Sequence, residues 1–359
     1  TAGALFPIFS LPGPYGIGVL GKEARKFAEF LLESGLHCWQ VLPMVQVGAG
    51  NSPYSGVSAF AGEPLYIDPE TLYENGLITK EELEDAKYPL SPYTVDYEWL
   101  LKSRPLLLRK AFQRLTPSMK EEMASFIEEN KDWLLDYALF MTLKANGKKI
   151  VNKAFLSEVD KEVVAQEESF SFYCFIQYEF YRQWIQLKKH CNDLGIGLIG
   201  DLPFYVSEDS SDVWANAHLF MLNQDFQPVG VGGTPPDYFS ESGQCWGNPL
   251  YDWKQMRVES YDWWIRRIAF HSQYNDALRI DHFRGFDRYW YIPAEEADAR
   301  KGHWEKGPGM DLFNAYRKKH GKAVPIIAED LGTLDDSFFS FLRKSGFPGM
   351  RVMQFAFDA

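Results

Sequence analysis

The chain has 359 residues, 46% of them hydrophobic, with 49 acidic against 37 basic residues and a net charge of −12. This acidic balance argues against a nucleic-acid partner, because affinity for phosphates depends on Lys and Arg, and no apolar stretch is long enough to span a membrane. The four cysteines (Cys38, Cys174, Cys191 and Cys245) are widely scattered without metal-ligand spacing. They predict reduced thiols and a cytoplasmic protein, or a plastid protein if the source is a plant.

The first motif along the chain is a glycine pattern, Gly16-Ile17-Gly18-Val19-Leu20-Gly21, which has the spacing of a dinucleotide-binding loop. Such a loop needs a strand before it, whereas two prolines stand there, and an acid at the end of the next strand, where none is found. We therefore interpret the pattern as a tight loop that enters a helix from Lys22 to Ser34. An NAD- or FAD-dependent oxidoreductase is a poor alternative, and no cofactor is predicted.

Two short apolar strands follow, at 37–42 and 64–67. The next stretch, from about 69 to 170, is rich in Glu and Lys and has helical periodicity without an apolar strand. We interpret it as a mostly helical insertion with a structural packing role. The predicted organisation is therefore a first part of the main domain (1–68), a helical insertion (69–170) and the continued main domain (171–359).

After the insertion, helical segments alternate with short apolar strands at 196–200, 277–281, 325–329 and 351–357. This alternation is typical of parallel β/α architecture. The segment 229–249 is rich in Gly and Pro and is predicted to be a long loop.

Acidic residues stand at the C-terminal ends of three consecutive strands, at Asp201, Asp281 and Glu329. A single Asp after a strand is more often a helix N-cap. Three in succession favour a site, because the C-terminal strand ends of a parallel barrel form its active rim and bring such residues together.

Two neighbours refine this prediction. Arg279 lies two residues before Asp281, so both side chains share a face of the strand, and the cation would keep the carboxylate ionised. Glu329 follows an apolar run, which tends to raise the pKa of a carboxyl group.

The adjacent Asp330 points to the opposite face, and the sequence leaves open which of the two faces inward. An ionised carboxylate about 5–5.5 Å from a protonated one is the pair that retaining glycoside chemistry needs.

The chain also resembles a known family. The segments YGIGVLG, SPYSGVSAFAGEPLYID, IGDLPFYV, GTPPDYFSESGQCWGNPLYDW, RIDHFRG and IAEDLG occur in the order found in amylomaltases, the 4-α-glucanotransferases of the α-amylase clan. The resemblance covers essentially the whole chain. Departures are small: Val19 replaces an expected Asp, and the first ten residues differ slightly from the usual start.

The resemblance implies roles for individual residues. Asp281 would be the nucleophile and Glu329 the general acid/base, with Arg279 orienting Asp281. Asp201 and His282 would hydrogen-bond the sugar in the donor site. A satisfied structural histidine is the alternative for His282.

The resemblance also implies two aromatic platforms, Trp246 on the acceptor side and Tyr54 on the donor side. For both, packing in the core is the alternative. No metal is implied.

The family fold is a (β/α)8 TIM-type barrel, and the family has a third carboxylate in a His-Asp motif on a later strand. Only six strands and no such motif are found, so we expect C-terminal strands of the barrel to lie outside this sequence. The implied function is transfer of α-1,4-glucan segments between maltooligosaccharides with retention. The alternatives are an α-glucan hydrolase or an inactive glucan-binding fragment.

Overall fold

The computed structural model describes residues 2–148, 151–237, 240–296, 298–321, 325–332 and 334–357. It divides into two compact units, Thr1–Ile199 and Gly200–Ala359. Strand β3 (Gly197–Leu202) runs through the boundary.

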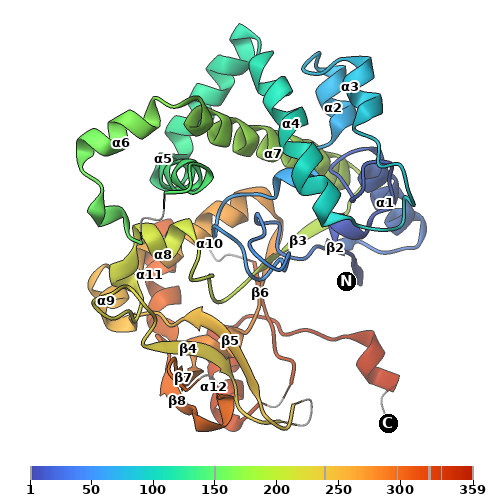
Figure 1. The fold of residues 1–359 in the computed structure, drawn as a ribbon. Helices are drawn as coiled ribbons and strands as arrows, with labels where there is room; N and C mark the ends of the chain where they lie inside the picture. Colours follow the sequence, from blue (N-terminus) through green and yellow to red (C-terminus); the bar gives the residue numbers. More distant parts are fainter. Residues whose placement is uncertain are drawn as a thin grey trace. The chain divides into compact units, whose positions relative to one another are not determined.

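Unit 1 begins with short parallel strands and continues with helices (Figure 1). Strand β1 (Gly3–Leu5) pairs with β2 (Cys38–Gln40), with Gly3 opposite Cys38, and β2 pairs with the start of β3, with Cys38 opposite Gly197. Its other elements are η1 (Ile8–Ser10), α1 (Lys22–Glu33), η2 (Pro64–Tyr66), α2 (Pro69–Glu74), α3 (Lys80–Asp85), α4 (Tyr97–Gln113), α5 (Pro117–Ala145), η3 (Lys153–Phe155), α6 (Glu158–Ala165) and α7 (Glu168–Asp193).

The glycine pattern leads directly into α1, with Gly21 at the N-cap position, as interpreted from the sequence. The apolar face of α1 buries Ala24, Ala28 and Leu31 completely. Gly35 follows the helix with φ +71°, a left-handed conformation that glycine adopts without steric cost.

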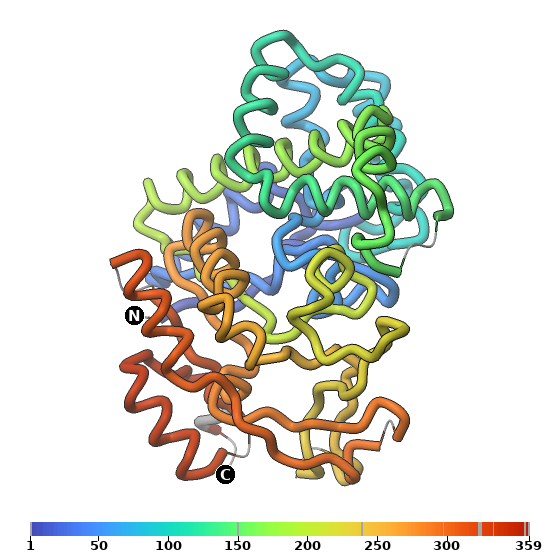
Figure 2. The backbone as a smooth tube through the Cα atoms, turned by 90° about the vertical axis from the view of Figure 1, so that its left-hand side faces the viewer, coloured from blue at the N-terminus to red at the C-terminus, as the bar shows by residue number. Residues whose placement is uncertain are grey.

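The described part of 69–170 is mostly helical, in agreement with its periodicity, and its long helix α5 packs along α7 (Figures 1 and 2). Side chains cap several of these helices. Thr79 and Glu82 form a capping box at α3, and Thr116 caps α5. The proposed boundaries of the insertion stay a prediction.

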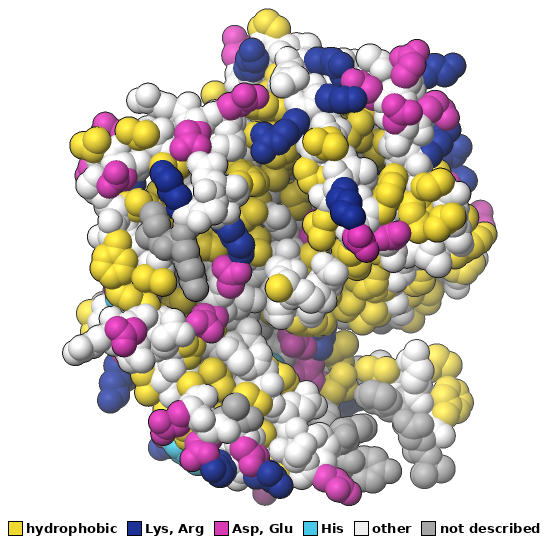
Figure 3. Space-filling model, in the orientation of Figure 1, with side chains coloured by type: hydrophobic (Ala, Val, Ile, Leu, Met, Phe, Trp, Pro, Cys, Tyr) yellow, Lys and Arg dark blue, Asp and Glu magenta, His cyan; other side chains and the backbone are white. Residues whose placement is uncertain are grey.

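The outer surface of these helices carries charges of both signs. On the face displayed in Figure 3, dark blue and magenta side chains are interspersed over α3 and α4. Glu82 of α3, for example, pairs with Lys110 at 3.4 Å and with Arg114 at 2.5 Å. Such mixed pairs are typical of a solvated helix surface and add little stability individually.

The predicted strand at 64–67 is wrong. This segment is the 3-10 helix η2, and the Glu63 side chain accepts a hydrogen bond from the Leu65 N–H at its start. Pro64 has no N–H to donate to a strand ladder, and the apolar side chains are buried by packing instead.

Unit 2 contains the end of β3 beside two further parallel strands. The Asp281 N–H donates to the Leu202 carbonyl at 3.0 Å, and β6 (Ala277–Ile280) pairs with β9 (Ile326–Ala328), with Ile280 opposite Ala328. The unit's elements are α8 (Ser211–Ala215), η4 (Ala217–Leu219), β4 (Gly230–Thr234), β5 (Gln244–Pro249), α9 (Trp253–Val258), α10 (Asp262–Tyr274), β6 (Ala277–Ile280), η5 (Phe283–Phe286), β7 (Arg288–Pro293), η6 (Ala299–Lys301), β8 (His303–Lys306), α11 (Met310–His320), β9 (Ile326–Ala328), α12 (Asp336–Ser345) and η7 (Met353–Phe357). Helices α11 and α12 lie side by side (Figure 2).

The segment 229–249 is not simply a loop. It contains β4 and β5, which join β7 and β8 in an antiparallel sheet of order β5-β4-β7-β8. The glycines of β4 are required there, because a Cβ on Gly232 would lie 2.6 Å from the Tyr205 ring. Glycine normally weakens a strand, so a Gly-rich segment predicts a loop. The close packing that requires glycine here involves residues outside the segment and cannot be deduced from its sequence.

The predicted strand at 351–357 is also wrong, because Met353–Phe357 forms the 3-10 helix η7. Its side chains Met353 and Phe357 are 73% and 75% exposed. A short apolar run does not distinguish a strand from other structures. Within the described residues, no helix is both long and apolar enough to cross a membrane.

Candidate active site

Three acids lie at one edge of the parallel strands of unit 2. Asp201 is the penultimate residue of β3, Asp281 directly follows β6, and Glu329 directly follows β9. The Glu329 N–H donates to the Ile280 carbonyl at 3.2 Å, so the hydrogen-bonded ladder extends up to the acids themselves. Neighbouring strands lie about 4.8 Å apart, and Asp281 and Glu329 follow paired positions on theirs.

Arg279 joins two of these acids. Its Nη1 lies 2.6 Å from Asp201 Oδ1 and its Nη2 lies 2.7 Å from Asp281 Oδ1, while Nε donates to the sulfur of Met350 at 3.3 Å. The side chain of Asp201 is fully buried, whereas that of Asp281 is 30% exposed. One guanidinium thus fixes both carboxylates, and Asp281 is the one that a solute can reach.

Glu329 has a different environment. Its pKa is raised to about 7, chiefly by burial and also by the neighbouring charge of Asp281, against the hydrogen bond that Oε1 accepts from the Leu331 N–H at 2.7 Å. The predicted increase in the pKa of Glu329 is confirmed. At neutral pH this carboxyl retains its proton in a large share of molecules.

The structure also distinguishes Glu329 from Asp330. Asp330 accepts a hydrogen bond from the Met350 N–H at 2.7 Å and lies 3.7 Å from Arg351, so it anchors the segment after α12. Gly349 is required for this approach, because a Cβ there would overlap the Asp330 carboxylate. Glu329 is therefore the residue that interacts electrostatically with Asp281.

His282 has a left-handed backbone, with φ +48°, and is only 9% exposed. Its Nε2 has no hydrogen-bond partner among the described residues. Burial, together with the charge of Arg284, lowers its pKa to about 3, so the imidazole is neutral near pH 7. Its ring lies edge-on to Trp246, with centroids 5.0 Å apart.

Trp246 stands on β5 and is 37% exposed, so it is not a core residue. Its Nε1 donates to Gln244 Oε1 at 3.0 Å. The sequence reasoning missed Tyr205, whose ring centroid lies 6.1 Å from those of both Trp246 and His282. Tyr205 is 6% exposed, and its hydroxyl has no partner within the described ranges. Its position three residues after the strand that carries Asp201 was the available signal.

Two buried side chains hold the turn that carries Tyr205. The Phe204 carbonyl accepts hydrogen bonds from the Tyr251 hydroxyl at 2.6 Å and from Arg267 Nη1 at 3.4 Å. Arg267 is 1% exposed and stacks over Trp264, 4.9 Å from its ring centroid. These two hydrogen bonds fix the backbone of the turn that carries Tyr205.

Tyr54 belongs to unit 1, and its role stays a prediction. It is half-buried in a loop, where its N–H donates to Ser52 Oγ at 3.3 Å. As for metals, no group of three or more His, Cys, Asp or Glu side chains in the described ranges is arranged to hold an ion.

Together these observations define a class of protein. Parallel strands end in an arginine-held, accessible carboxylate beside a carboxyl group that keeps its proton near neutrality, which is the combination used by enzymes that cleave glycosidic bonds with retention.

The chain belongs to the 4-alpha-glucanotransferase family, whose model matches residues 6–359. It is 42% identical to the 4-alpha-glucanotransferase of Clostridium butyricum, over 98% of this chain and 74% of that protein. It is 45% identical to that of Thermus thermophilus, over 99% of this chain and 72% of that protein. The predicted family and its enzymatic class are confirmed.

Solved structures agree. An amylomaltase from Streptococcus agalactiae in complex with acarbose matches with a TM-score of 0.93 at 40% identity, covering 99% of this chain and 74% of that one. An amylomaltase from Corynebacterium glutamicum matches with a TM-score of 0.80 at 20% identity, covering 97% and 50%, which shows the shared fold. The predicted α/β fold class is confirmed.

Proposed function

We propose that this 4-alpha-glucanotransferase moves α-1,4-glucan segments between maltooligosaccharides by two displacements at one anomeric carbon, with Asp281 and Glu329 as the catalytic residues. The observation that carries the proposal is their contrast: Asp281 is held by Arg279 at 2.7 Å, while burial raises the pKa of Glu329 to about 7.

In the first displacement, Asp281 attacks the anomeric carbon of the donor as Glu329 protonates the glycosidic oxygen. The bond to the leaving maltooligosaccharide breaks and a glycosyl ester of Asp281 forms. In the second, Glu329 removes the proton from the 4-hydroxyl of an acceptor, whose oxygen attacks the same carbon and releases Asp281. Two inversions give net retention.

The remaining residues bind the sugars. Asp201, held by Arg279, and His282, whose Nε2 lacks a partner among the described residues, would hydrogen-bond the donor sugar. Trp246 would stack on the acceptor side and Tyr54 on the donor side, since an aromatic ring offers a flat apolar face to a sugar. The exposure of Trp246 supports its part of this proposal.

The substrates would be α-1,4-glucans and maltooligosaccharides, in line with the acarbose complex of the similar amylomaltase. A cytoplasmic location is supported by the four cysteines, all in the described ranges, which form no disulfide bonds.

The experiment incubates the protein with maltotriose and follows the products. Transfer gives glucose together with oligomers longer than maltotriose, whereas a hydrolase gives only shorter sugars.

Asp281→Asn should lose at least about 10³-fold in turnover, or about 4 kcal/mol of transition-state stabilisation.

Undiminished turnover in Asp281→Asn would remove this residue from the mechanism. Binding of maltooligosaccharide in calorimetry without any turnover would instead identify an inactive glucan-binding fragment.

A further inference from the structure

The Tyr54 loop, defined as residues 45–63, has a hairpin-like course in unit 1. Isolated bridges join Val45 to Gly62 and Val47 to Gly56. The Gln46 N–H donates to the Ala61 carbonyl at 2.8 Å, and the Val57 N–H donates to the Gln46 carbonyl at 2.9 Å. These contacts fix the base of the loop, and Tyr54 lies near its tip.

Helices α5 and α7 hold this base through buried polar side chains. Gln177 of α7 accepts a hydrogen bond from the Gly62 N–H at 2.7 Å and donates back to the Gly62 carbonyl at 3.0 Å. It also donates to the hydroxyl of Tyr137 of α5 at 3.2 Å, and that hydroxyl donates to Gln46 Oε1. Gln177 and Tyr137 are both 0% exposed. Gln177 therefore provides hydrogen-bond partners for both the N–H and the C=O of Gly62. Through Tyr137 it also connects Gly62 to Gln46, on the opposite side of the loop.

Two further contacts act at the same place. The Glu63 carboxylate accepts hydrogen bonds from the Val47 N–H at 2.8 Å and the Leu65 N–H at 3.0 Å, and the Tyr181 hydroxyl of α7 donates to the Phe60 carbonyl. Gly62 has no space for a side chain, because a Cβ there would overlap the ring of Phe180. The base of the loop thus lies directly against α7.

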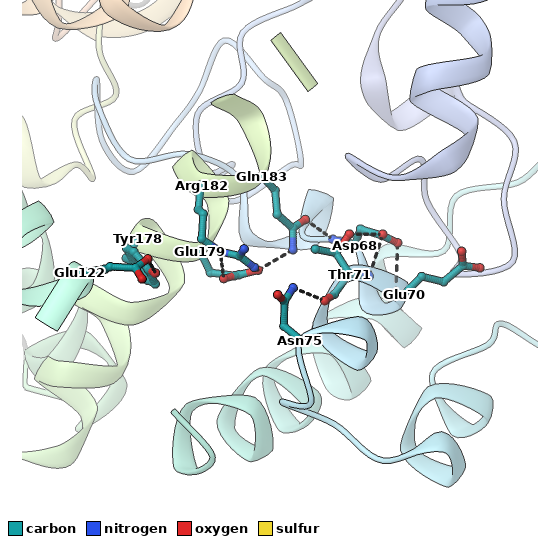
Figure 4. Close-up of polar contacts among 9 residues, drawn as sticks. All are labelled: Asp68, Glu70, Thr71, Asn75, Glu122, Tyr178, Glu179, Arg182 and Gln183. Atoms are coloured by element: carbon teal, nitrogen blue, oxygen red, sulfur yellow. Dashed lines mark hydrogen bonds and ion pairs between the residues drawn. The ribbon is translucent and has the colours of Figure 1, made fainter. Parts of the chain in front are cut away.

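The same helix makes a second set of polar contacts one to two turns further on (Figure 4). Gln183 accepts from the Asp68 N–H at 2.7 Å and donates to Glu179 at 2.6 Å, and Glu179 also pairs with Arg182. Asp68 in turn caps α2 through Thr71. This set holds the start of α2 and makes no contact with the Tyr54 loop in the described hydrogen bonds.

Helix packing alone does not require a glutamine at position 177. An apolar side chain of similar size would fill the same space, but it would leave the Gly62 N–H and C=O buried without partners, which is costly inside a protein. The glutamine therefore specifies the position of the loop rather than the contact between helices.

We propose that Gln177 is a positioning residue for donor binding, which holds the base of the Tyr54 loop against α7 so that Tyr54 is presented in one place. The helical segment then serves substrate binding in addition to packing. The inference rests on the proposed function, specifically on the donor-side role of Tyr54.

The experiment compares Gln177→Met with Gln183→Met, since both glutamines are at most 1% exposed and lie on the same helix. Both variants should lose stability in thermal unfolding. Gln177→Met should raise the donor KM about 10-fold with little change in kcat, as expected for a loss of uniform binding. Gln183→Met should leave the donor KM unchanged.

A double variant shows whether Gln177 acts through Tyr54. Tyr54→Ala should raise the donor KM by itself, and adding Gln177→Met should raise it by less than about 2-fold more, because the two changes remove one shared interaction. If Gln177→Met does not fold, Tyr137→Phe removes one hydroxyl from the same set with little change of shape, and it should raise the donor KM in the same way.

An unchanged donor KM in Gln177→Met or in its substitute Tyr137→Phe, or an equal rise in both glutamine variants, would overturn the inference. So would an unchanged donor KM in Tyr54→Ala, although the proposed chemistry would stand if Asp281→Asn were inactive. An active Asp281→Asn would refute the proposed catalytic residues without bearing on the loop.

Discussion

At the residue scale, Arg279 places one positive charge between two carboxylates, because two different nitrogen atoms of its guanidinium contact Asp201 and Asp281. Three acids at the strand ends would repel one another if all were ionised. One fixed cation between Asp201 and Asp281, together with a proton on Glu329, reduces that repulsion. The three acids thus differ in their surroundings: Asp201 and Asp281 pair with Arg279, whereas Glu329 has a raised pKa.

Arg279→Lys should lower kcat about 100-fold, because a single ammonium cannot reproduce the planar fork that holds both carboxylates. Steady-state kinetics on maltotriose measure the effect. Arg182→Lys is the matched control, since Arg182 also makes two hydrogen bonds to one buried carboxylate, that of Glu179, but in unit 1. A kcat in Arg279→Lys that stays within a few-fold of the original would contradict this role.

The pH profile should report Glu329. Because its pKa is raised to about 7 and the protonated form is required for donor cleavage, kcat/KM should fall as pH increases through 7, by about tenfold per unit above it. A glycosyl fluoride donor, whose leaving group needs no proton, should lose most of this basic limb. The same basic limb with both donors would exclude Glu329 as its source.

At the element scale, side chains of α7 make the hydrogen bonds to the backbone around 62–68 that a neighbouring strand would make in a sheet. Gln177 and Gln183 bind the backbone of Gly62 and Asp68, between which η2 forms. Glutamines buried in the middle of a helix are costly unless their amides are satisfied. Here the segment that they hold supplies the partners.

Glu63 makes the stability of this element dependent on pH. Burial raises its pKa from 4.5 to about 7, against the hydrogen bonds from the Val47 and Leu65 N–H groups and the positive charge of Arg104, so the folded chain binds the proton more tightly than the unfolded chain does. Its contribution is therefore fully present below pH 4.5 and is lost as pH rises through 7, by about 3 kcal/mol in total.

In Glu63→Gln this component should disappear, and urea unfolding between pH 5 and pH 8 should show a smaller decline in stability than in the original chain. The variant should be less stable at pH 5 by about 1 kcal/mol, because one of the two N–H bonds is lost. The same measurement on Glu329→Gln gives the part of the decline that is due to Glu329, because the pKa of Glu329 is also raised to about 7. An unchanged slope in Glu63→Gln would contradict the assignment.

At the scale of the whole molecule, the chain consists of two compact units with different architecture: short parallel strands and long helices in unit 1, and parallel strands with an antiparallel sheet in unit 2. Each unit has buried aromatic side chains, such as Tyr137 in unit 1 and Trp264 in unit 2. The cysteines offer a probe of each unit, because Cys174 and Cys191 are buried in unit 1 and Cys245 is exposed in unit 2.

Thiol labelling of the native protein should modify Cys245 quickly and leave Cys174 and Cys191 unmodified. Burial raises the pKa of Cys174 to about 12, so its reactive thiolate is almost absent at neutral pH. Peptide mass spectrometry after a brief pulse of reagent, with and without urea, measures this. Rapid labelling of Cys174 without urea would show that unit 1 opens.

The sequence alone determined the features that depend on short-range spacing. Strand periodicity followed by an acid placed Asp201, Asp281 and Glu329 at strand ends, and the two-residue interval placed Arg279 on the same face as Asp281. Such relations are set by the pleat of one strand, and so they can be deduced without any knowledge of the partner strands.

Only the tertiary structure decided features that depend on contacts distant in sequence. The choice between Glu329 and Asp330 depends on Met350, and the irregular course of 64–67 depends on α7, more than 100 residues away. The antiparallel sheet within 229–249 depends on glycines that admit the Tyr205 ring. In each case a buried hydrogen bond or a close packing contact outweighs local propensity, because a backbone polar group inside a protein must find its partner wherever the fold provides one.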